Sequence, residues 1–498
     1  MQTNPTTNHI DVLFIFLGID KVSTSYRSFG TPPLGIAYLA AICERDGYNT
    51  KFVDLNFDNV SDEKIADIIR QSNPKVVGVS FVTEARFEAF KLFKLTKDVS
   101  PQIITLAGGP HPSLCAEDTL SNIEDLDIIV RGEGEETFSE LMKSIVSKNH
   151  DLTGIRGLSY RENGKVRHNE DRLPIKDLNL LPFAALHLIS FDQYDFHLDV
   201  PGHGKLKAAP IMSSRGCPLR CNFCATTKNW GAFWRARSPE NVIAEIKLLI
   251  DRYRIEAIWF VDDNFNANIK RADTICNEII KANLGIKWLC NMRVDRVKRE
   301  HLELMAKAGC FSIEYGAESG SQRILDDVVK KKIKVEQIIH FDEWCQELGI
   351  MTDGQFIVSH PTETFEEAKE TINLMKTLKG KSTLQIMKVY PGTEIERIAK
   401  EKNIIPQDFS WAKSKGKTDQ ISAITGEAPL FIDQINLKQI TELMAVAWTE
   451  IGSFSTFYLV KKVLQKIRSP GEIYHYSKLG FPIILKKFRN AIFKQSRT

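Results

Sequence analysis

The sequence lacks the long hydrophobic run that would mark a membrane protein. Its N-terminal apolar stretch, Val12 to Leu17, is about as long as one strand and follows no basic region. No stretch reaches the ~20 apolar residues that a membrane-spanning helix requires. The chain also lacks a strong charge of either sign, since 66 basic and 63 acidic residues leave a net charge of +3. That balance gives no indication of a nucleic-acid partner.

The sequence also lacks the even number of cysteines that would let every cysteine form a disulfide. The 498 residues include nine cysteines, an odd number. Disulfides are rare in reducing compartments, where cysteines stay free or bind metal. We therefore expect free or metal-bound thiols and a cytoplasmic location.

The first part of the chain alternates strand-like and helix-like segments. Such alternation is typical of a parallel, doubly wound α/β sheet, in which ligands bind beyond the carboxyl ends of the strands. We expect this Rossmann-like domain to cover residues 1–148. The strands are predicted at 11–18, 49–56, 75–83, 102–110 and 126–135, and the helices at 32–47, 61–73 and 135–146.

A second alternating series follows a predicted linker at 149–205, which contains a short hairpin turning at Asn163-Gly164. Six strand–helix units predict a partial (β/α)6 barrel over residues 206–400, with its chemistry at the strand carboxyl ends. Residues 401–498 are expected to form a mostly helical extension. The barrel strands are predicted at 209–216, 257–265, 286–293, 311–319, 353–359 and 383–392, and the helices at 240–253, 268–283, 298–308, 335–348 and 364–377.

Three cysteines lie close together in "SSRGCPLRCNFC", directly after the first predicted barrel strand. Cys217, Cys221 and Cys224 form a C-x3-C-x2-C spacing. Structural zinc and tetrahedral iron–sulfur clusters both use four ligand positions. Three thiolates without a nearby fourth ligand would leave one iron open to a small chelating molecule. A zinc site with a distant fourth ligand is the alternative.

This segment resembles the cluster motif of the radical S-adenosylmethionine (SAM) superfamily. The resemblance implies a [4Fe-4S] cluster whose open iron chelates SAM, and reductive cleavage of SAM to a 5′-deoxyadenosyl radical. Further segments resemble the SAM-contacting motifs of the superfamily: "IWFVDDNF", "IEYGAESGS" and "FIVSHPTET". The candidate SAM contacts are Phe223, Asp262, Asp263, Asn291, Arg293, Glu318 and Ser319. Ser359 and Thr362 stand where glycine is usual in the last motif.

The first domain resembles the cobalamin-binding domain of a radical SAM subfamily through "AGGPHPS" and "RGEGEETF". Glycines let the backbone approach a bulky ligand closely, and a helix N-terminus suits phosphate. The motif D-x-H-x-x-G, whose histidine replaces the lower axial ligand in many cobalamin proteins, is absent, so cobalamin would bind without a histidine ligand. A pocket that no longer binds cobalamin is the alternative. The candidate cobalamin contacts are Ser80, Thr83, Glu84, Gly108, Gly109, Gly132, Glu133 and Gly134.

The resemblance implies an enzyme that uses the deoxyadenosyl radical and methylcobalamin to methylate an unactivated carbon. Because cofactors would perform this chemistry, no acid–base dyad is expected. A radical cyclase or rearrangement enzyme, either cobalamin-dependent or cobalamin-free, is the alternative within the family. An iron–sulfur or cobalamin-binding sensor is the alternative from another class.

The C-terminal segment from Phe457 to Thr498 combines ten Lys or Arg residues with a single acid, Glu472. Its interleaved apolar residues suggest either a solvated helical face or peripheral contact with an anionic membrane. Membrane contact would fit a lipid or isoprenoid substrate, and a small molecule is the alternative. A reducing partner such as flavodoxin or ferredoxin is implied by the cluster.

Overall fold

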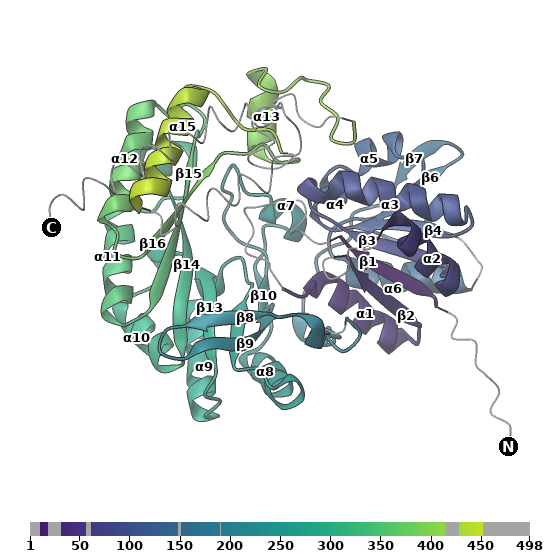
Figure 1. Cartoon of the computed structure of the whole chain (residues 1–498), viewed down its shortest axis with the longest axis horizontal. Coiled ribbons are helices and arrows are strands. Elements are labelled where there is room, and N and C mark those ends of the chain that lie inside the picture. Colours follow the sequence, from purple (N-terminus) through teal and green to yellow (C-terminus); the bar gives the residue numbers. More distant parts are fainter. Residues whose placement is uncertain are drawn as a thin grey trace.

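Two α/β units lie side by side in the structure, a computed structural model that describes residues 10–17, 31–55, 61–147, 151–189, 191–413 and 428–451 (Figure 1). The predicted mixed α/β class is therefore confirmed. Each unit is built on a seven-stranded sheet. In both, the strands from the interior of the sheet are buried, which matches the near-continuous apolar runs from which they were predicted.

The first sheet has the strand order β2-β1-β3-β4-β5-β6-β7, and β1 to β5 run parallel. Helices lie on both of its faces (Figure 1). The strands are β1 (Val12–Phe16), β2 (Thr50–Asp54), β3 (Val76–Ser80), β4 (Ile104–Gly108) and β5 (Ile128–Val130). The helices are α1 (Leu34–Asp46), α2 (Asp62–Ser72), α3 (Arg86–Val99), α4 (Pro110–Leu114), α5 (Ala116–Asn122) and α6 (Gly134–Val146).

Helix α3 was not among the predicted helices. Its buried residues include Ala89, Leu92 and Phe93, which share one helical face. This spacing was present in the sequence and could have identified the helix. The short helices α4 and α5 were also missed, and they occupy the loop that follows the predicted glycine motif of β4.

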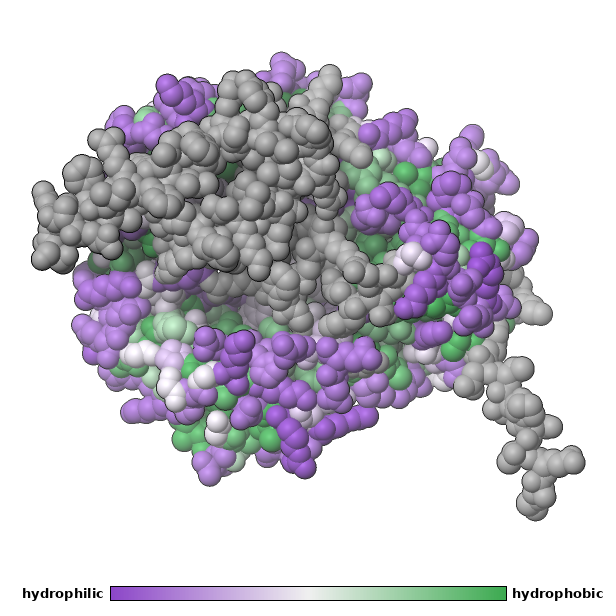
Figure 2. Space-filling view, viewed as in Figure 1, coloured by the Kyte–Doolittle hydropathy of each residue, from purple (hydrophilic) through white to green (hydrophobic). Residues whose placement is uncertain are grey.

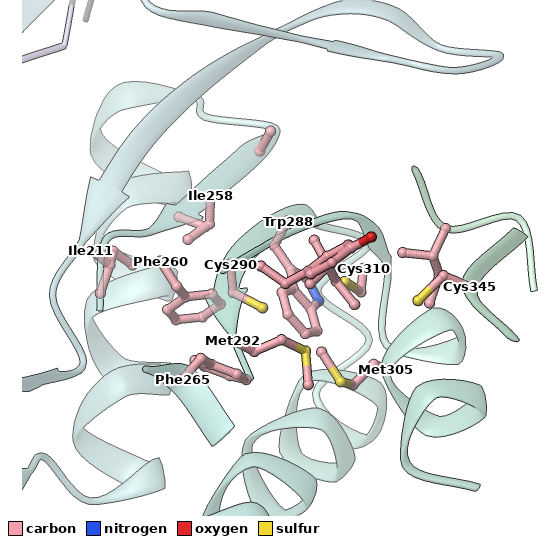
Figure 3. Packing of buried hydrophobic residues seen from close by; sticks show 14 of the residues in the cluster. Ile211, Ile258, Phe260, Phe265, Trp288, Cys290, Met292, Met305, Cys310 and Cys345 are labelled. Carbon is pink, nitrogen blue, oxygen red and sulfur yellow. The ribbon is translucent and has the colours of Figure 1, made fainter. Parts of the chain in front are cut away.

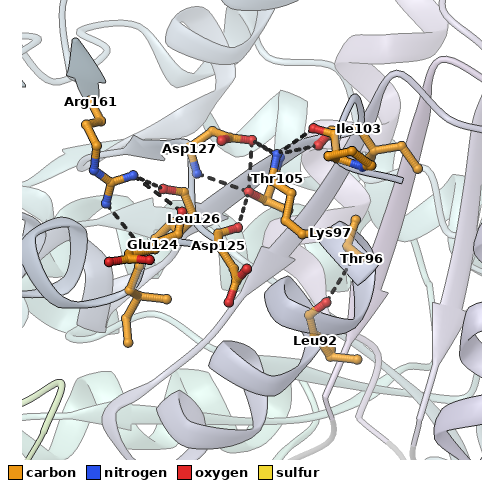
Figure 4. Close-up of polar contacts among 12 residues, drawn as sticks. Leu92, Thr96, Lys97, Ile103, Thr105, Glu124, Asp125, Leu126, Asp127 and Arg161 are labelled. Atoms are coloured by element: carbon orange, nitrogen blue, oxygen red, sulfur yellow. Dashed lines mark hydrogen bonds and ion pairs between the residues drawn. The ribbon is translucent and has the colours of Figure 1, made fainter. Parts of the chain in front are cut away.

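The predicted hairpin is present as β6 (Leu158–Glu162) and β7 (Lys165–His168), and its turn residues Asn163 and Gly164 have φ of 50° and 76°. It does not stand apart as a linker, because β6 pairs antiparallel with β5 and extends the first sheet. Arg161 donates to the carbonyl oxygens of Ile123 and Leu126 at 3.2 and 3.1 Å (Figure 4). Beside it, Asp127 accepts from Lys97 and Thr105. The first half of the expected 149–205 linker thus completes the first domain.

The second sheet has the order β16-β15-β14-β13-β12-β9-β8, in which six strands run parallel and β8 joins antiparallel at one edge. It curls into an open barrel with helices outside (Figure 1). The strands are β8 (His197–Val200), β9 (Gly204–Ile211), β12 (Ala257–Phe260), β13 (Lys287–Met292), β14 (Cys310–Glu318), β15 (Met351–Val358) and β16 (Lys381–Ile386), with a separate pair β10 (Ser214–Arg215) and β11 (Arg235–Ala236). The helices are α7 (Thr226–Trp230), α8 (Pro239–Tyr253), α9 (Ile269–Lys281), α10 (Arg299–Lys307), α11 (Val335–Glu347), α12 (Phe365–Thr377), α13 (Glu394–Glu401) and α15 (Leu437–Val446).

Aromatic and sulfur-containing side chains fill the core of the barrel. Phe260, Phe265 and Trp288 pack with ring centroids 4.8 to 5.5 Å apart (Figure 3). The indole of Trp288 donates to the carbonyl of Ala308 at 2.9 Å, which satisfies its one buried polar atom. Four further cysteines are buried core residues: Cys276, Cys290, Cys310 and Cys345.

The segment after α13 crosses back to the first domain. The carbonyl of Trp411 accepts from the buried Arg86 at 2.8 Å, and the backbone N–H of Ala412 donates to Asp118 at 2.9 Å. The indole of Trp411 packs edge-on against the ring of His111 and donates to Glu396 of α13 at 2.8 Å. This segment therefore fastens the end of the barrel to the first domain.

The described surface mixes hydrophilic and apolar residues on the face shown in Figure 2. Among the described residues, no helix is both long and apolar enough to cross a membrane. The basic C-terminal segment 457–498, for which membrane contact was considered, lies outside the described residues.

Replacing Trp411 with alanine is expected to lower the free energy of unfolding by about 3–5 kcal/mol, because a buried indole is lost at the domain junction. Urea denaturation measures this loss. Trp344→Ala is the control, since Trp344 is only partly buried on α11 of the barrel. An equal loss in both variants would contradict a special role for the junction.

Candidate functional site

The cysteine motif lies in the loop after β10, at the carboxyl end of the barrel. Gly216 has φ of 82°, and a Cβ there would lie 2.5 Å from the carbonyl oxygen of Phe233. Glycine is therefore required directly before Cys217. Cys217, Cys221 and Cys224 are partly exposed, whereas the other six cysteines are buried. The motif thus presents three accessible thiols on one tight loop.

Charged side chains from neighbouring strands surround these thiols. Burial raises the pKa of Cys221 to about 11, and the nearby Lys331 opposes this shift. Burial also raises the pKa of Cys224, against hydrogen bonds from Thr226. These thiols are protonated in the protein alone, so binding to iron would require them to release protons.

Asp262 and Asp263 follow β12 but face different partners. Asp262 is fully buried and accepts from the backbone N–H of Ser213 at 2.7 Å and from the hydroxyls of Ser213 and Ser214 at 2.6 and 2.5 Å. The Asp262 carboxylate therefore accepts three hydrogen bonds and stabilises the segment that leads into the cysteine loop.

Asp263 is exposed at the barrel mouth, where it accepts from Thr226 at 3.1 Å. Although the residue is accessible to solvent, protein atoms around the carboxyl group partly desolvate it and raise its pKa to about 6. A cationic ligand group would lower this pKa, because an opposite charge favours the ionised form. Asp263, rather than Asp262, has the position expected of a ligand-binding carboxylate.

Glu318 ends β14 with φ of 66°, an unusual conformation for a residue with a side chain. Its carboxylate accepts from Lys331 at 2.7 Å, and the same ammonium group donates to the carbonyl of Gly316 at 2.6 Å. Backbone strain of this kind costs of order 1–3 kcal/mol and concentrates at functional sites. Lys331 was not predicted, because nothing in "VKKKIK" distinguishes it from its neighbours.

Arg293 follows β13 and is held by three hydrogen bonds. It donates to both carboxylate oxygens of Asp295 at 2.8 Å and to the carbonyl of Lys331 at 2.9 Å. Its Nη1 is buried and has no hydrogen-bond partner among the described residues. An unsatisfied buried donor is costly, so this nitrogen is suited to an anionic ligand group.

The last two SAM candidates are engaged with the protein. Asn291 donates to the carbonyl of Asp262 at 3.3 Å. Ser319 is fully buried, lies 3.2 Å from the Thr371 hydroxyl and accepts from the N–H of Ser321 at 3.1 Å. Both residues therefore shape the strand ends beside the thiols.

The glycine loops of the first domain lie along the carboxyl edge of its sheet. Gly109 has φ of 95°, and a Cβ would lie 2.8 Å from the Ser80 hydroxyl. Gly108, by contrast, has open space around a Cβ, whose nearest neighbour is 3.9 Å away. Gly132 has no neighbouring atom within 4 Å of a Cβ, and its N–H donates to Ser113 at 3.0 Å. Gly134 begins α6. Gly108 and Gly132 therefore leave open space at the sheet edge, whereas the backbone at Gly109 packs closely against Ser80.

Three other candidate cobalamin-binding residues contact other side chains of the protein. Thr83 lies 3.1 Å from Nδ1 of His111, and Glu84 accepts from the hydroxyl of Tyr390 at 2.6 Å. Glu133 forms ion pairs with Arg235 and Arg215 at 2.5 and 3.3 Å. Glu84 and Glu133 thus join the first domain to the barrel, whereas the contact of Thr83 lies within the first domain. No local sequence signal indicated these partners.

Arg215, directly before the cysteine loop, is the centre of this junction. Besides Glu133, it pairs with Glu135 at 2.5 Å, and all three side chains are buried. Its guanidinium lies over the rings of Tyr38 and Trp230 at 5.4 and 5.1 Å. The cysteine loop is therefore anchored to the start of α6 in the first domain.

The two candidate sites face each other. Helix α4, which follows Gly109, lies against α7, which follows Cys224 (Figure 1). Phe223 of the cysteine motif packs with Leu114 and Cys115 of the first domain in one apolar cluster. The carboxyl edge of the first sheet thus lies next to the thiol loop.

The residues present fit an iron–sulfur cluster and its chelating ligand. Among the described residues, no three His, Cys, Asp or Glu side chains converge on a single metal ion. A four-iron cluster does not need such convergence, because each thiolate binds a different iron. The unpaired nitrogen of Arg293 and the carboxylates of Asp263 and Glu318 suit a zwitterionic ligand beside the thiols.

Comparison with known proteins identifies the family. Residues 22–142 match a B12 binding domain, and residues 211–375 match the radical SAM superfamily. An uncharacterized methyltransferase of Pyrococcus horikoshii is 34% identical over 446 residues, which cover 88% of this chain and 91% of the relative. The chain belongs to the cobalamin-binding radical SAM family. This membership confirms the predicted resemblance and favours an enzyme over a sensor.

Other relatives of this radical SAM protein carry different activities in their names. An anaerobic magnesium-protoporphyrin IX monomethyl ester cyclase of Rubrivivax gelatinosus is 30% identical, covering 69% of this chain and 62% of the relative. The solved methyltransferase TsrM of Kitasatospora setae, with cobalamin and a [4Fe-4S] cluster bound, has a TM-score of 0.64 at 18% identity and covers 78% of this chain and 75% of that one. The cobalamin-dependent radical enzyme OxsB has a TM-score of 0.69 at 19% identity and covers 97% and 72%. These structures share the fold.

Single replacement of Cys217, Cys221 or Cys224 by alanine is expected to remove most of the iron and sulfide bound after anaerobic reconstitution, because each thiolate binds one iron. Iron and acid-labile sulfide per chain are the measurements. Cys276→Ala is the matched control, since this thiol is buried in the barrel core and burial raises its pKa. Retention of iron in any motif variant would contradict the assignment.

Replacing Arg215 with glutamine is expected to lower the free energy of unfolding by about 3–5 kcal/mol, because Glu135 loses its buried counter-charge. Chemical denaturation measures the change. Arg397→Gln should leave stability near that of the unmodified protein, since Arg397 pairs with glutamates on an exposed helix face. If both variants behaved alike, the junction would not depend on Arg215.

Proposed function

We propose that this protein is a cobalamin-dependent C-methyltransferase that acts on a small-molecule or lipid substrate. The observation that carries the proposal is the position of the cobalamin-type sheet edge beside the thiol loop, through α4 and α7. A methyl donor held at that edge would face the mouth of the barrel. The names of several relatives, including hopanoid methylases, support methylation.

When bound, the cluster would supply the electron that cleaves SAM, and cobalamin would supply the methyl group. The chain would hold SAM by its charges: Asp263 and Glu318 would face its amino group, and Arg293 its carboxylate. Phe223 would provide an apolar wall. Asp262, Asn291 and Ser319 would position these residues. No side chain is assigned an acid–base role.

Cobalamin would occupy the cradle framed by Ser80, Gly108, Gly109, Gly132 and Gly134 without a histidine ligand. The loop after β1 contains no histidine. His111, the histidine nearest to the glycine motif, is buried against Phe81 and Trp411, and burial lowers its pKa to about 3. This burial of the ring between Phe81 and Trp411 supports binding without axial histidine ligation.

Radical cyclisation is the second candidate, favoured by the cyclase of Rubrivivax gelatinosus among the relatives. Both reactions would use the same cofactors, so the substrate decides between them. A reducing partner such as flavodoxin or ferredoxin would supply electrons. Peripheral membrane contact of residues 457–498 is an additional hypothesis that vesicle binding would test.

Gly108→Leu is expected to abolish near-stoichiometric cobalamin retention while leaving iron content and SAM cleavage intact. Gly108 does not adopt a left-handed conformation, and the space around its Cβ position is open, so the leucine would fill the cradle without forcing the backbone. The corrin absorbance per chain after anaerobic reconstitution, incubation with hydroxocobalamin and desalting measures retention.

Gly154→Leu is the matched control, because Gly154 is an exposed glycine with equally open surroundings. If the unmodified protein cleaved SAM but retained no cobalamin, the methyltransferase proposal would be wrong. If cobalamin is retained, the transfer of a labelled methyl group from SAM to candidate substrates separates methylation from cyclisation in the cobalamin-loaded enzyme.

A further inference from the structure

The three most exposed large apolar side chains among the described residues lie on two segments beside the thiol loop. Leu180, Phe233 and Leu173 are 76, 75 and 68% exposed, whereas the next in order, Ile280, is 43% exposed. Large apolar side chains that gather on a protein surface mark a place where another molecule binds. The first three residues are called the apolar patch below.

Hydrogen bonds join the two segments that carry the apolar patch. The guanidinium group of Arg235 donates to the carbonyl of Ile175 at 2.8 Å. The backbone N–H of Ser238 donates to the side-chain oxygen of Asn179 at 2.8 Å. The connector before the barrel therefore runs alongside the chain that leaves the thiol loop, and the patch residues lie on adjoining segments.

The pairing of β10 with β11 places the patch beside the first thiol of the motif. Arg215 pairs with Arg235 in an antiparallel register, which, continued by two residues, puts Phe233 opposite Cys217. A Cβ at Gly216 would lie 2.5 Å from the carbonyl oxygen of Phe233, so the two chains stay in contact beyond the paired strands. The patch therefore lies at the surface next to a thiol that would bind the cluster.

Exposed cations accompany the apolar patch. Lys176, Arg220 and Lys228 are exposed, and their side chains form no hydrogen bond or ion pair with the described residues. Arg220 stands inside the cysteine motif, Lys176 lies on the connector, and Lys228 lies on α7. Two acids of the connector are already engaged: Asp171 pairs with an arginine, and Asp177 accepts two hydrogen bonds from a neighbouring asparagine. The patch therefore has unpaired positive charges around it.

We propose that the apolar patch and its three cations form the docking surface for the reducing partner, a small acidic protein that carries one electron. The inference rests on the proposed function, in which the cluster must be reduced before SAM is cleaved. The step at this surface is the transfer of one electron. The carrier is oxidised and the cluster is reduced by one electron, and no bond forms or breaks.

The position, size and charge of the surface favour this occupant. An electron that enters beside Cys217 arrives at a residue that would bind the cluster directly. Electron-transfer complexes use small interfaces, below about 1,200 Å², so a patch of three apolar side chains suffices. Cations around such a patch steer an acidic partner toward it. The segment 457–498 of this chain, with ten basic residues and one acid, has the wrong charge to occupy it.

Single replacements that leave the thiols untouched test this surface. Phe233→Asp and Leu173→Asp introduce a negative charge into the apolar patch, and Lys176→Glu reverses one of its cations. Ile280→Asp and Lys247→Glu are the matched controls. They alter an exposed apolar side chain on α9 and an exposed, unpaired lysine on α8.

Two properties are measured on protein with a reconstituted cluster. Biolayer interferometry under anaerobic conditions gives the Kd for a recombinant flavodoxin and for a recombinant ferredoxin. Stopped-flow absorbance follows the bleaching of the oxidised cluster by the carrier that binds more tightly, in its reduced form. The same bleaching is followed with titanium(III) citrate, a small reductant that needs no docking surface.

We expect Phe233→Asp to raise the Kd for the carrier about tenfold and to slow its reduction of the cluster, as for a residue at the centre of an interface. Leu173→Asp and Lys176→Glu should act in the same direction, and Lys176→Glu should also weaken the salt dependence of binding. Iron content and reduction by titanium(III) citrate should be unchanged. Both controls should behave as the unmodified protein does.

An unchanged Kd for the carrier in Phe233→Asp and Leu173→Asp would overturn the proposal. Slower reduction by titanium(III) citrate would overturn it too and assign Phe233 to the cluster itself. Weaker binding to phosphatidylglycerol vesicles with a normal Kd for the carrier would instead assign the patch to a membrane surface.

The unmodified protein separates the two proposals. If it bound neither flavodoxin nor ferredoxin, the docking surface would be wrong, whatever the reaction. If the carrier bound and reduced the cluster but SAM was not cleaved, the proposed function would be wrong and the docking surface would stand.

Discussion

The structure depends on one buried ion-pair network at the junction of its two domains. Arg215 pairs with Glu133 and Glu135, and Arg235 pairs with Glu133, all from buried positions. Such networks contribute little net stability, because desolvation offsets much of the attraction. They do penalise any displacement that separates the charges. Since Arg215 stands two residues before Cys217, the network fixes the thiol loop relative to the first sheet.

A second, apolar attachment holds the same junction from the other side. Phe223 of the thiol loop packs with Leu114 and Cys115 of the first domain, and Trp411 docks beside His111. The loop is thus bound to the first domain through Arg215, two residues before the motif, and through Phe223 within it. One attachment is ionic and the other is apolar, and they lie near opposite ends of the eight-residue motif. Together they restrain both the distance and the orientation of the two facing sites.

The sequence predicted the sheets and the cysteine loop because those features are local. Apolar runs marked the strands, and Cys217, Cys221 and Cys224 are close in the chain. The sequence could not separate Asp262 from Asp263, since their roles differ only through Ser213 and Ser214, which lie ~50 residues earlier. Glu133 was likewise expected to face a ligand, but its partner Arg215 lies in the other domain. The sequence alone could not predict the roles of residues that depend on a partner distant in the chain.

The mouth of the barrel holds strained and unsatisfied groups among well-packed neighbouring elements. Glu318 has a left-handed backbone, and Nη1 of Arg293 is buried without a hydrogen-bond partner among the described residues. Each feature costs free energy in the protein alone and gains it back only when a ligand supplies the missing charge or hydrogen bond. Such costs persist because the surrounding elements leave these groups no alternative position. The free nitrogen of Arg293 and the carboxylate of Asp263 are therefore suited to a charged ligand group beside the thiols, on the side of the barrel next to the first domain.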